Sequence, residues 1–152
     1  MAHIELSLTP ADAAPDALPS LRVVGRPRDL DAWLAAVAEA EEPCLVLDAG
    51  GVIMGASPAA VRLLGAEAAD ELLGRGLLED VVELLDFAGG ADRLPDTQLP
   101  RLAPLLALGS GALARGLMRI RSGGEVVTLD AVSTPLRVDG ELAGSLTFFH
   151  RL

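Results

Sequence analysis

The sequence predicts an α+β domain with an antiparallel sheet, short helices on one face of that sheet, and an amphipathic helix before it. Three observations support this class. Two apolar strands joined by a glycine turn follow the first helix, several short helical segments broken by glycines come next, and three strands joined by two-residue turns follow those. The chain has 152 residues, 51% of them hydrophobic, which suits one domain with a substantial core.

The N-terminal part divides into a tail and a helix. Residues 1–26 are rich in Ala, Pro and Asp without a sustained period, so we expect a flexible tail, with a short strand near Leu21–Val24. Residues 27–42 predict an amphipathic helix capped by Asp29. Its apolar stripe follows i, i+3, i+4 and i+7 spacing and consists of Leu30, Trp33, Leu34 and Val37.

Two strands and a helix start come next. Cys44–Asp48 and Val52–Ala56 predict a strand pair around a glycine turn. Ser57 is placed to cap a helix that has Pro58 at its first position and ends near Leu64.

Three further helical segments are expected before the last strands. Residues 66–73 predict a short helix, and residues 77–87 predict a better one, with leucines and valines facing inward. Residues 99–108 predict a third helix, in which Pro104 either makes a kink or marks the true first turn.

The last part of the chain predicts a three-stranded meander. Strands are expected at 117–121, 126–137 and 141–152, joined by Gly123-Gly124 and Asp139-Gly140 turns. The first turn places Val127 opposite Ile120 and Leu129 opposite Met118. The second turn predicts three more opposed pairs: Ser133 with Leu146, Ala131 with Phe148, and Leu129 with His150.

This register separates an apolar face from a polar one. The apolar face is expected to hold Met118, Ile120, Val127, Leu129, Ala131, Leu146 and Phe148. Val132 and Phe149 fall on the polar face, where something should cover them. The stripe of the N-terminal helix is the natural cover, from the same chain or from a partner subunit.

The order of these elements resembles the PAS domain family over residues 43–152, after a tail and a helix. Two stretches of this chain carry the resemblance. The family's opening stretch is similar to LVLDAGGVIMGASPAAVRLLGAEAADELLG, and the family's closing hairpin is similar to GEVVTLDAVSTPLRVDGELAGSLTFF. Ser57 stands where the family often has Asn. The resemblance implies a five-stranded antiparallel sheet, a cavity between sheet and helices, and a role in sensing or dimerisation within signal transduction or transcription regulation.

Two candidate sites follow from the pattern and the resemblance. A small-molecule cavity would be lined by Met118, Leu129, Ser133, Leu146, Phe148 and His150. A homodimer interface would be formed by Leu30, Trp33, Leu34, Val37, Val132 and Phe149. For Ser133 we favour an internally bonded hydroxyl over a ligand contact, and for His150 a strand-end side chain in solvent over a haem ligand or pH sensor.

Composition excludes several functional classes. Acidic residues outnumber basic ones 22 to 12, which disfavours direct binding to nucleic acid or to an anionic membrane. We expect a cytoplasmic protein, because there is no signal-peptide pattern and only one cysteine, Cys44, interpreted as a buried inert thiol. Every basic residue apart from histidine is Arg, which is typical of a bacterium with a GC-rich genome.

No catalytic set or metal-ligand spacing stands out, so we expect a non-catalytic domain without a metal site. Flavin and haem have no supporting motif, and no cofactor is expected. Four interpretations stay open: a ligand-sensing PAS domain, a ligand-free PAS domain that binds a signalling or regulatory protein, a roadblock- or GAF-like interaction domain, and a cone-shaped α+β cavity enzyme. The enzyme requires a buried acid that the sequence does not place.

Overall fold

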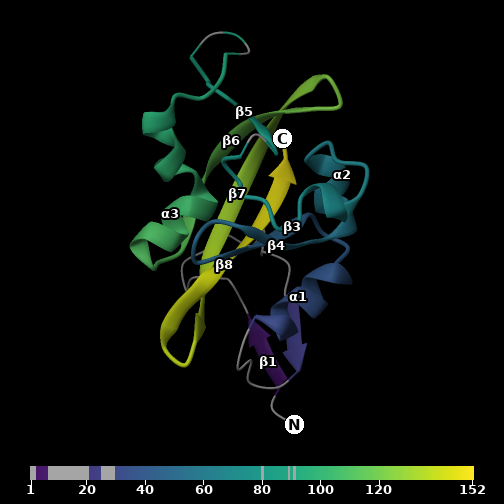
Figure 1. The fold of residues 1–152 in the computed structure, drawn as a ribbon, viewed down its shortest axis with the longest axis vertical. Helices are drawn as coiled ribbons and strands as arrows, with labels where there is room; N and C mark the ends of the chain where they lie inside the picture. Colours follow the sequence, from purple (N-terminus) through teal and green to yellow (C-terminus); the bar gives the residue numbers. More distant parts are fainter. Residues whose placement is uncertain (1–2, 7–20, 25–29, 80, 89, 91) are drawn as a thin grey trace.

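The computed structural model describes residues 3–6, 21–24, 30–79, 81–88, 90 and 92–152 (Figure 1). The strands are β1 (His3–Leu6), β2 (Leu21–Val24), β3 (Cys44–Asp48), β4 (Ile53–Ala56), β5 (Glu83–Leu85), β6 (Ala114–Ser122), β7 (Glu125–Val138) and β8 (Glu141–Arg151). The helices are α1 (Asp31–Ala38), α2 (Pro58–Leu63) and α3 (Ala103–Ser110), with 3₁₀ turns η1 (Ala69–Glu71) and η2 (Asp96–Arg101).

The main sheet is antiparallel and has six strands in the order β4-β3-β8-β7-β6-β5. All five expected strands are present. The sixth, β5, comes from the segment 77–87, where the prediction of a helix was wrong. Its residues pair with β6, as Leu84 does with Ile120, and an isolated bridge joins Leu85 to Arg93 on the other side. These distant partners satisfy the backbone N–H and C=O groups of the segment. It therefore forms a strand, although the spacing of its apolar residues is also compatible with a helix.

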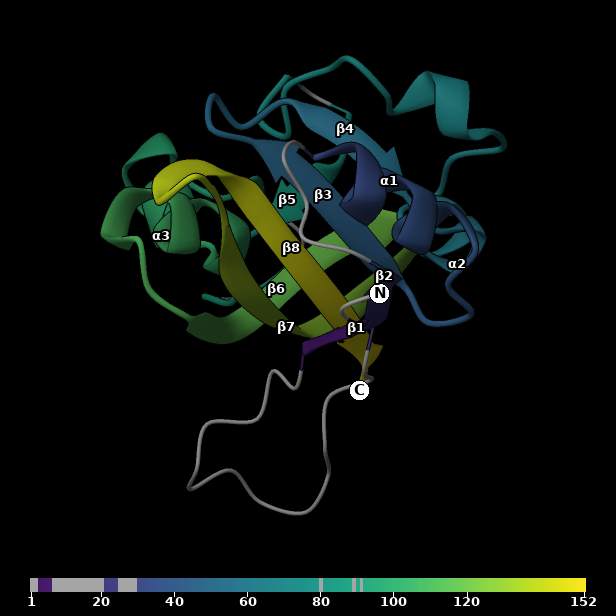
Figure 2. The same cartoon turned by 90° about the horizontal axis from the view of Figure 1, so that it is seen from below.

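The two faces of the sheet are covered differently. On the inner face, α2, α3 and the segments between them pack on the main core, to which the sheet contributes Leu45, Leu47, Met118, Ile120, Val127, Leu129, Ala131 and Phe149. On the outer face, α1 lies across β3 and β4 (Figure 2). The outer cluster under α1 consists of Trp33, Val37, Cys44, Val46, Leu136, Leu146 and Phe148.

Helix boundaries differ from the expected ones mainly at their ends. Helix α1 is shorter than 27–42, with Leu30 as its N-cap, and the predicted cap Asp29 lies outside the described residues. Helix α2 begins as predicted, because Ser57 Oγ accepts a hydrogen bond from Ala60 N at 3.1 Å. The helix expected at 66–73 is only the single turn η1. Pro104 lies in the first turn of α3, the second of its two expected positions.

The first hairpin of the meander has the predicted register, with Val127 opposite Ile120 and Leu129 opposite Met118. The second hairpin has the predicted turn but not the predicted register. Val138 pairs with Glu141, and a bulge then leaves Ala143 without a partner. Beyond the bulge each residue of β7 meets the residue one later in β8, which gives the pairs Ser133 with Thr147, Ala131 with Phe149, and Leu129 with Arg151.

One extra residue reverses the faces of β8, because side chains alternate along a strand. Leu146 and Phe148, expected on the inner face, lie in the outer cluster, and Phe149, expected on the outer face, lies in the main core. Val132 is buried and pairs with Phe148, so its expected position on the outer face is confirmed.

The N-terminal residues form a separate two-stranded ladder. Strand β1 pairs antiparallel with β2, which confirms the strand expected at Leu21–Val24. The other residues of the predicted tail, 1–2, 7–20 and 25–26, lie outside the described residues. Among the helices that the structure describes, none has the length and apolar character required to span a bilayer.

Candidate functional site

The inner face of β7 and β8 carries buried hydroxyl groups where the ligand cavity was expected. Ser133 Oγ and Thr147 Oγ1 lie 2.7 Å apart and share a hydrogen bond. Ser145 Oγ donates to the carbonyl oxygen of Pro104 in α3 at 3.2 Å. All three residues are fully buried, and these hydrogen bonds satisfy their hydroxyl groups within the chain. Ser133 therefore has the internal bond that we favoured for it.

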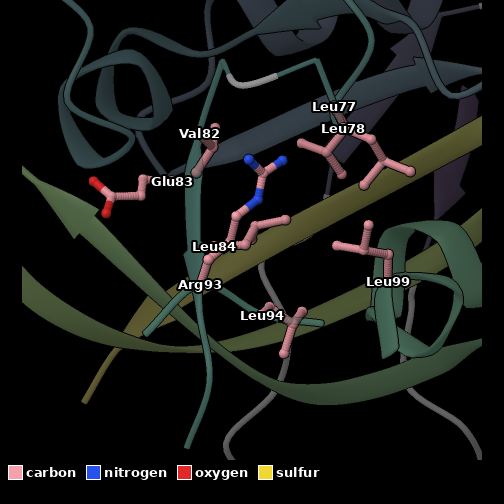
Figure 3. Close-up of a pocket in the computed structure, with 8 residues that line it drawn as sticks. All are labelled: Leu77, Leu78, Val82, Glu83, Leu84, Arg93, Leu94 and Leu99. Atoms are coloured by element: carbon pink, nitrogen blue, oxygen red, sulfur yellow. The ribbon is translucent and has the colours of Figure 1, made fainter. Parts of the chain in front are cut away.

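A partly enclosed pocket of about 250 Å³ lies beside β5 (Figure 3). It is lined by Leu77, Leu78, Val82, Glu83, Leu84, Arg93, Leu94 and Leu99. Four of the apolar residues are buried in the main core, whereas Leu78 is 42% exposed. The pocket thus extends from the core to the molecular surface, and its walls are mainly leucine and valine side chains. Apolar walls of this kind are common in sites that bind small molecules.

Backbone bonds and one arginine hold the segment that forms the pocket. Leu94 N donates to Leu84 O at 2.9 Å, and Asp86 N donates to Asp92 O at 2.8 Å. Arg119 of β6 donates from Nη1 to the carbonyl oxygens of Asp86 and Gly90, at 3.0 and 2.8 Å. The segment that supplies Leu84 and Leu94 is therefore fixed to the neighbouring strand.

The two charged residues of the pocket point in different directions. Figure 3 shows the carboxylate of Glu83 turned away from the leucines, and its Oε2 lies 3.1 Å from Nε of Arg121. The guanidinium of Arg93 instead extends toward the side of the pocket where Val82 and Leu77 lie. The lining therefore combines six apolar side chains with a positive charge.

Comparison with known proteins agrees with this architecture. The family model described as PAS fold matches residues 31–88, from α1 past β5. Solved PAS domains match the arrangement of the chain over about four fifths of its length. The chain has the PAS fold. These comparisons favour that fold over the roadblock- or GAF-like interpretation.

Among the solved structures, the PAS domain of a Colwellia psychrerythraea protein superposes with a TM-score of 0.56 at 15% identity, covering 81% of this chain and 96% of that one. The PAS domain of nitrogen regulation protein NR(II) from Vibrio parahaemolyticus gives 0.53 at 20% identity, covering 78% and 95%. The Vibrio cholerae VqmA dimer, a LuxR-type receptor, gives 0.56 at 17% identity, covering 79% and 50%. No curated protein matches the sequence.

The PAS fold separates the residues expected to form one cavity. Met118, Leu129 and Ser133 lie on the inner face as predicted. Leu146 and Phe148 lie in the outer cluster beneath α1. His150 was predicted beside Leu129, but it is exposed on the outer face opposite Asp130, as a strand-end side chain. The bulge at Ala143 is the physical reason for this division.

The residues expected at a dimer interface are also divided. Leu30, Trp33, Leu34 and Val37 of α1 pack against the outer cluster of the same chain. The packing is close, because a Cβ atom added at Gly55 of β4 would lie 2.9 Å from Cδ2 of Leu34. Phe149 lies on the other side of the sheet, in the main core. Within the described chain, α1 is thus an internal cover, and its role between subunits stays a prediction.

None of the eight residues that line the pocket was among the predicted site residues. Leu77, Leu78, Val82 and Leu84 belong to the segment predicted as a helix, and Arg93 and Leu94 lie between that segment and the helix expected at 99–108. The apolar content of 77–85 was visible in the sequence, but only the pairing of β5 with β6 brings these residues to Arg93.

Cys44 lies at the start of β3 and is fully buried. Burial raises the pKa of its thiol to about 11, a hydrogen bond with Ser57 lowers it, and the charge of Glu42 raises it. Ser57 Oγ also accepts from Cys44 N at 3.0 Å and donates to Glu42 O at 2.7 Å. The described residues contain no group of three His, Cys, Asp or Glu side chains placed to hold a metal ion.

We expect native Cys44 to react with a disulfide reagent at pH 8 at least ~100-fold more slowly than in the urea-unfolded chain, because a pKa near 11 leaves few thiolates. The folded-state pKa lies above that of the unfolded chain. The stabilisation is therefore complete below about pH 8.5 and is lost as the pH rises toward 11. Labelling kinetics and urea titrations at several pH values test both points. Rapid labelling of the native protein would contradict the buried position of Cys44.

Proposed function

We propose that this chain is a non-catalytic sensory and interaction module, as PAS domains of signalling proteins generally are. It binds a small, largely apolar molecule in the pocket beside β5 and transmits its occupancy to a regulatory partner in the cytoplasm. The pocket carries this proposal, since six leucines and valines line it while the hydroxyls of the inner face are already satisfied. The proposal includes no catalytic step.

Protein association without a ligand is the second candidate. Leu117 supports it, because this leucine is 52% exposed on the outer face of β6, three strands along the sheet from β3, whereas α1 packs mainly on β3 and β4. An apolar side chain on an open sheet face is suited to a second subunit or to another signalling protein. In this candidate the pocket beside β5 stays empty.

Native mass spectrometry of the purified protein distinguishes the two functions. A retained small molecule supports sensing, whereas a ligand-free dimer supports association alone. A Leu78→Trp variant tests the location of the site, because a larger side chain at this half-exposed position should obstruct the pocket without disturbing the core.

Leu73→Trp is the matched control, since Leu73 is 38% exposed and does not line the pocket. We expect the Leu78 variant to lose the retained mass and the Leu73 variant to keep it. Equal retention by both variants would show that the molecule binds elsewhere.

A further inference from the structure

We infer that the edge of β6 at Arg115 and Leu117 binds an extended segment of a partner protein, which adds to the main sheet as a further strand. This inference rests on the proposed interaction role and names the site and the class of partner. It does not depend on a ligand in the pocket beside β5.

The hydrogen bonds of the sheet determine which backbone groups of β6 point to its edge. Leu152 N donates to Thr128 O at 3.0 Å, so the even-numbered residues of this part of β7 face β8 and the odd-numbered ones face β6. Leu129 therefore exchanges hydrogen bonds with its partner Met118. The even-numbered residues of β6 thus face β7, and its odd-numbered residues face the side where β5 lies.

Strand β5 occupies only part of that side. Its last paired residue, Leu85, lies opposite Arg119 of β6. Leu84, one residue earlier, points away from β6, because its carbonyl oxygen accepts from Leu94 N at 2.9 Å. This alternation agrees with the odd-numbered residues of β6 facing β5.

Arg115 and Leu117 are the odd-numbered residues of β6 that β5 leaves uncovered. Within the part of the chain that the structure describes, no backbone group pairs with their N–H and C=O groups on this side. A row of such groups is the feature that an extended peptide recognises when it adds to a sheet. Two donors and two acceptors are therefore available to a further strand.

The side chains around this edge give an added strand both room and apolar contact. Leu117 is exposed, and so is Leu113, just before β6. A Cβ atom added at Gly116 would meet no atom within 4 Å, so space is open on the inner side. Arg115 is already paired with Asp130, and the partner need not supply a carboxylate for it. A segment with apolar residues at alternate positions fits this edge.

The charge of the chain and the position of β5 decide between possible partners. The net charge of −10 disfavours an acidic segment and favours a neutral or basic one. A second copy would use all four groups by antiparallel pairing about Gly116, which brings its Leu113 opposite Arg119. Leu85 of β5 already holds that position. We therefore expect a short neutral or basic segment of another protein, which binds reversibly.

Amide hydrogen exchange followed by NMR tests the edge in the full chain without a partner. The amides of Arg115 and Leu117 should exchange at least ~100-fold faster than those of Gly116 and Met118, which are bonded to β7. Equal protection of the two sets would show that the edge is covered and would overturn the inference.

Titration with a designed hexapeptide, acetyl-KVTVTK-amide, tests the binding. It alternates apolar and polar residues, and both of its charges are positive. We expect it to slow exchange at Arg115 and Leu117. The same peptide with both valines N-methylated lacks two donors and should bind at least ~10-fold more weakly. Equal binding of the two peptides, or no protection of the edge at millimolar concentration, would overturn the inference.

Leu117→Pro and Leu117→Ala form a matched pair of variants. Proline removes the N–H that faces the edge and leaves the bonds to β7 in place, whereas alanine shortens the side chain and keeps this N–H. The proline variant should bind the hexapeptide at least ~10-fold more weakly than the alanine variant, and equal binding would contradict strand addition. The sensing pocket stands or falls separately, by the molecule that native mass spectrometry finds retained.

Discussion

Replacing Gly144 with alanine should destabilise the domain by more than ~3 kcal/mol, a large part of the total stability of a protein of this size. Gly144 lies in the middle of the sheet, where it pairs with Asp48 of β3 on one side and with Leu136 of β7 on the other. A Cβ atom at this position would point directly onto the carbonyl oxygen of Leu47 and lie 3.1 Å from its carbonyl carbon. Backbone cannot move aside as a flexible side chain can, so β3 and β8 would have to separate.

Urea unfolding followed by circular dichroism measures this effect, and Gly116→Ala is the matched control. Gly116 also lies inside a strand, β6, but a Cβ atom added there meets no atom within 4 Å. The control should be neutral or stabilised by about 0.5–1 kcal/mol, because alanine loses less conformational entropy on folding. A Gly144→Ala protein as stable as the Gly116→Ala protein would contradict the close approach of β3 and β8.

Replacing Trp33 with alanine should cost about 3–5 kcal/mol, the range for removing a large aromatic side chain from a core. Trp33 is only 4% exposed and belongs to the outer cluster with Leu146 and Phe148. Its removal leaves a cavity between α1 and the sheet and weakens the cover over these two residues.

Unfolding free energies and binding of a hydrophobic dye test the prediction for Trp33. Leu117→Ala, at a residue 52% exposed, should change the stability by less than ~0.5 kcal/mol and should not increase dye binding. Equal losses for the two variants would show that α1 does not cover the sheet as described. Because Trp33 is the only tryptophan of the chain, its emission gives a direct signal of its burial before any substitution.

Local patterns predicted most of the sheet because tight turns fix strand pairing over short distances. The Gly123-Gly124 turn determined the partners of Val127 and Leu129 correctly, since no residue interrupts that hairpin. The second hairpin failed at a single residue, Ala143, whose bulge leaves the turn unchanged but reverses every later side chain. Gly144 was the available signal, because a glycine inside a strand often marks a bulge or a close backbone approach.

The candidate pocket could not be predicted in the same way. The leucines and valines of residues 77–85 suit one face of a helix as well as a buried strand, and the sequence alone does not distinguish the two. The strand forms because Leu84 pairs with Ile120 of β6 and Leu85 pairs with Arg93, and both pairings depend on the rest of the fold. The pocket results from these pairings, so a wrong assignment of one segment hid the whole site.

During synthesis, β3 is made well before β8, its partner strand in the sheet. The two strands are neighbours in the sheet, and Cys44 near the start of the domain pairs with Phe148 near the end of the described chain. Ribosomes add roughly 5–20 residues per second, so β3 and β4 emerge seconds before the strand that lies between them and β7. Until then the apolar side chains of both faces of β3 have no sheet to join. The sheet therefore cannot be completed before β8 has been made, which leaves apolar residues of β3 exposed in the nascent chain.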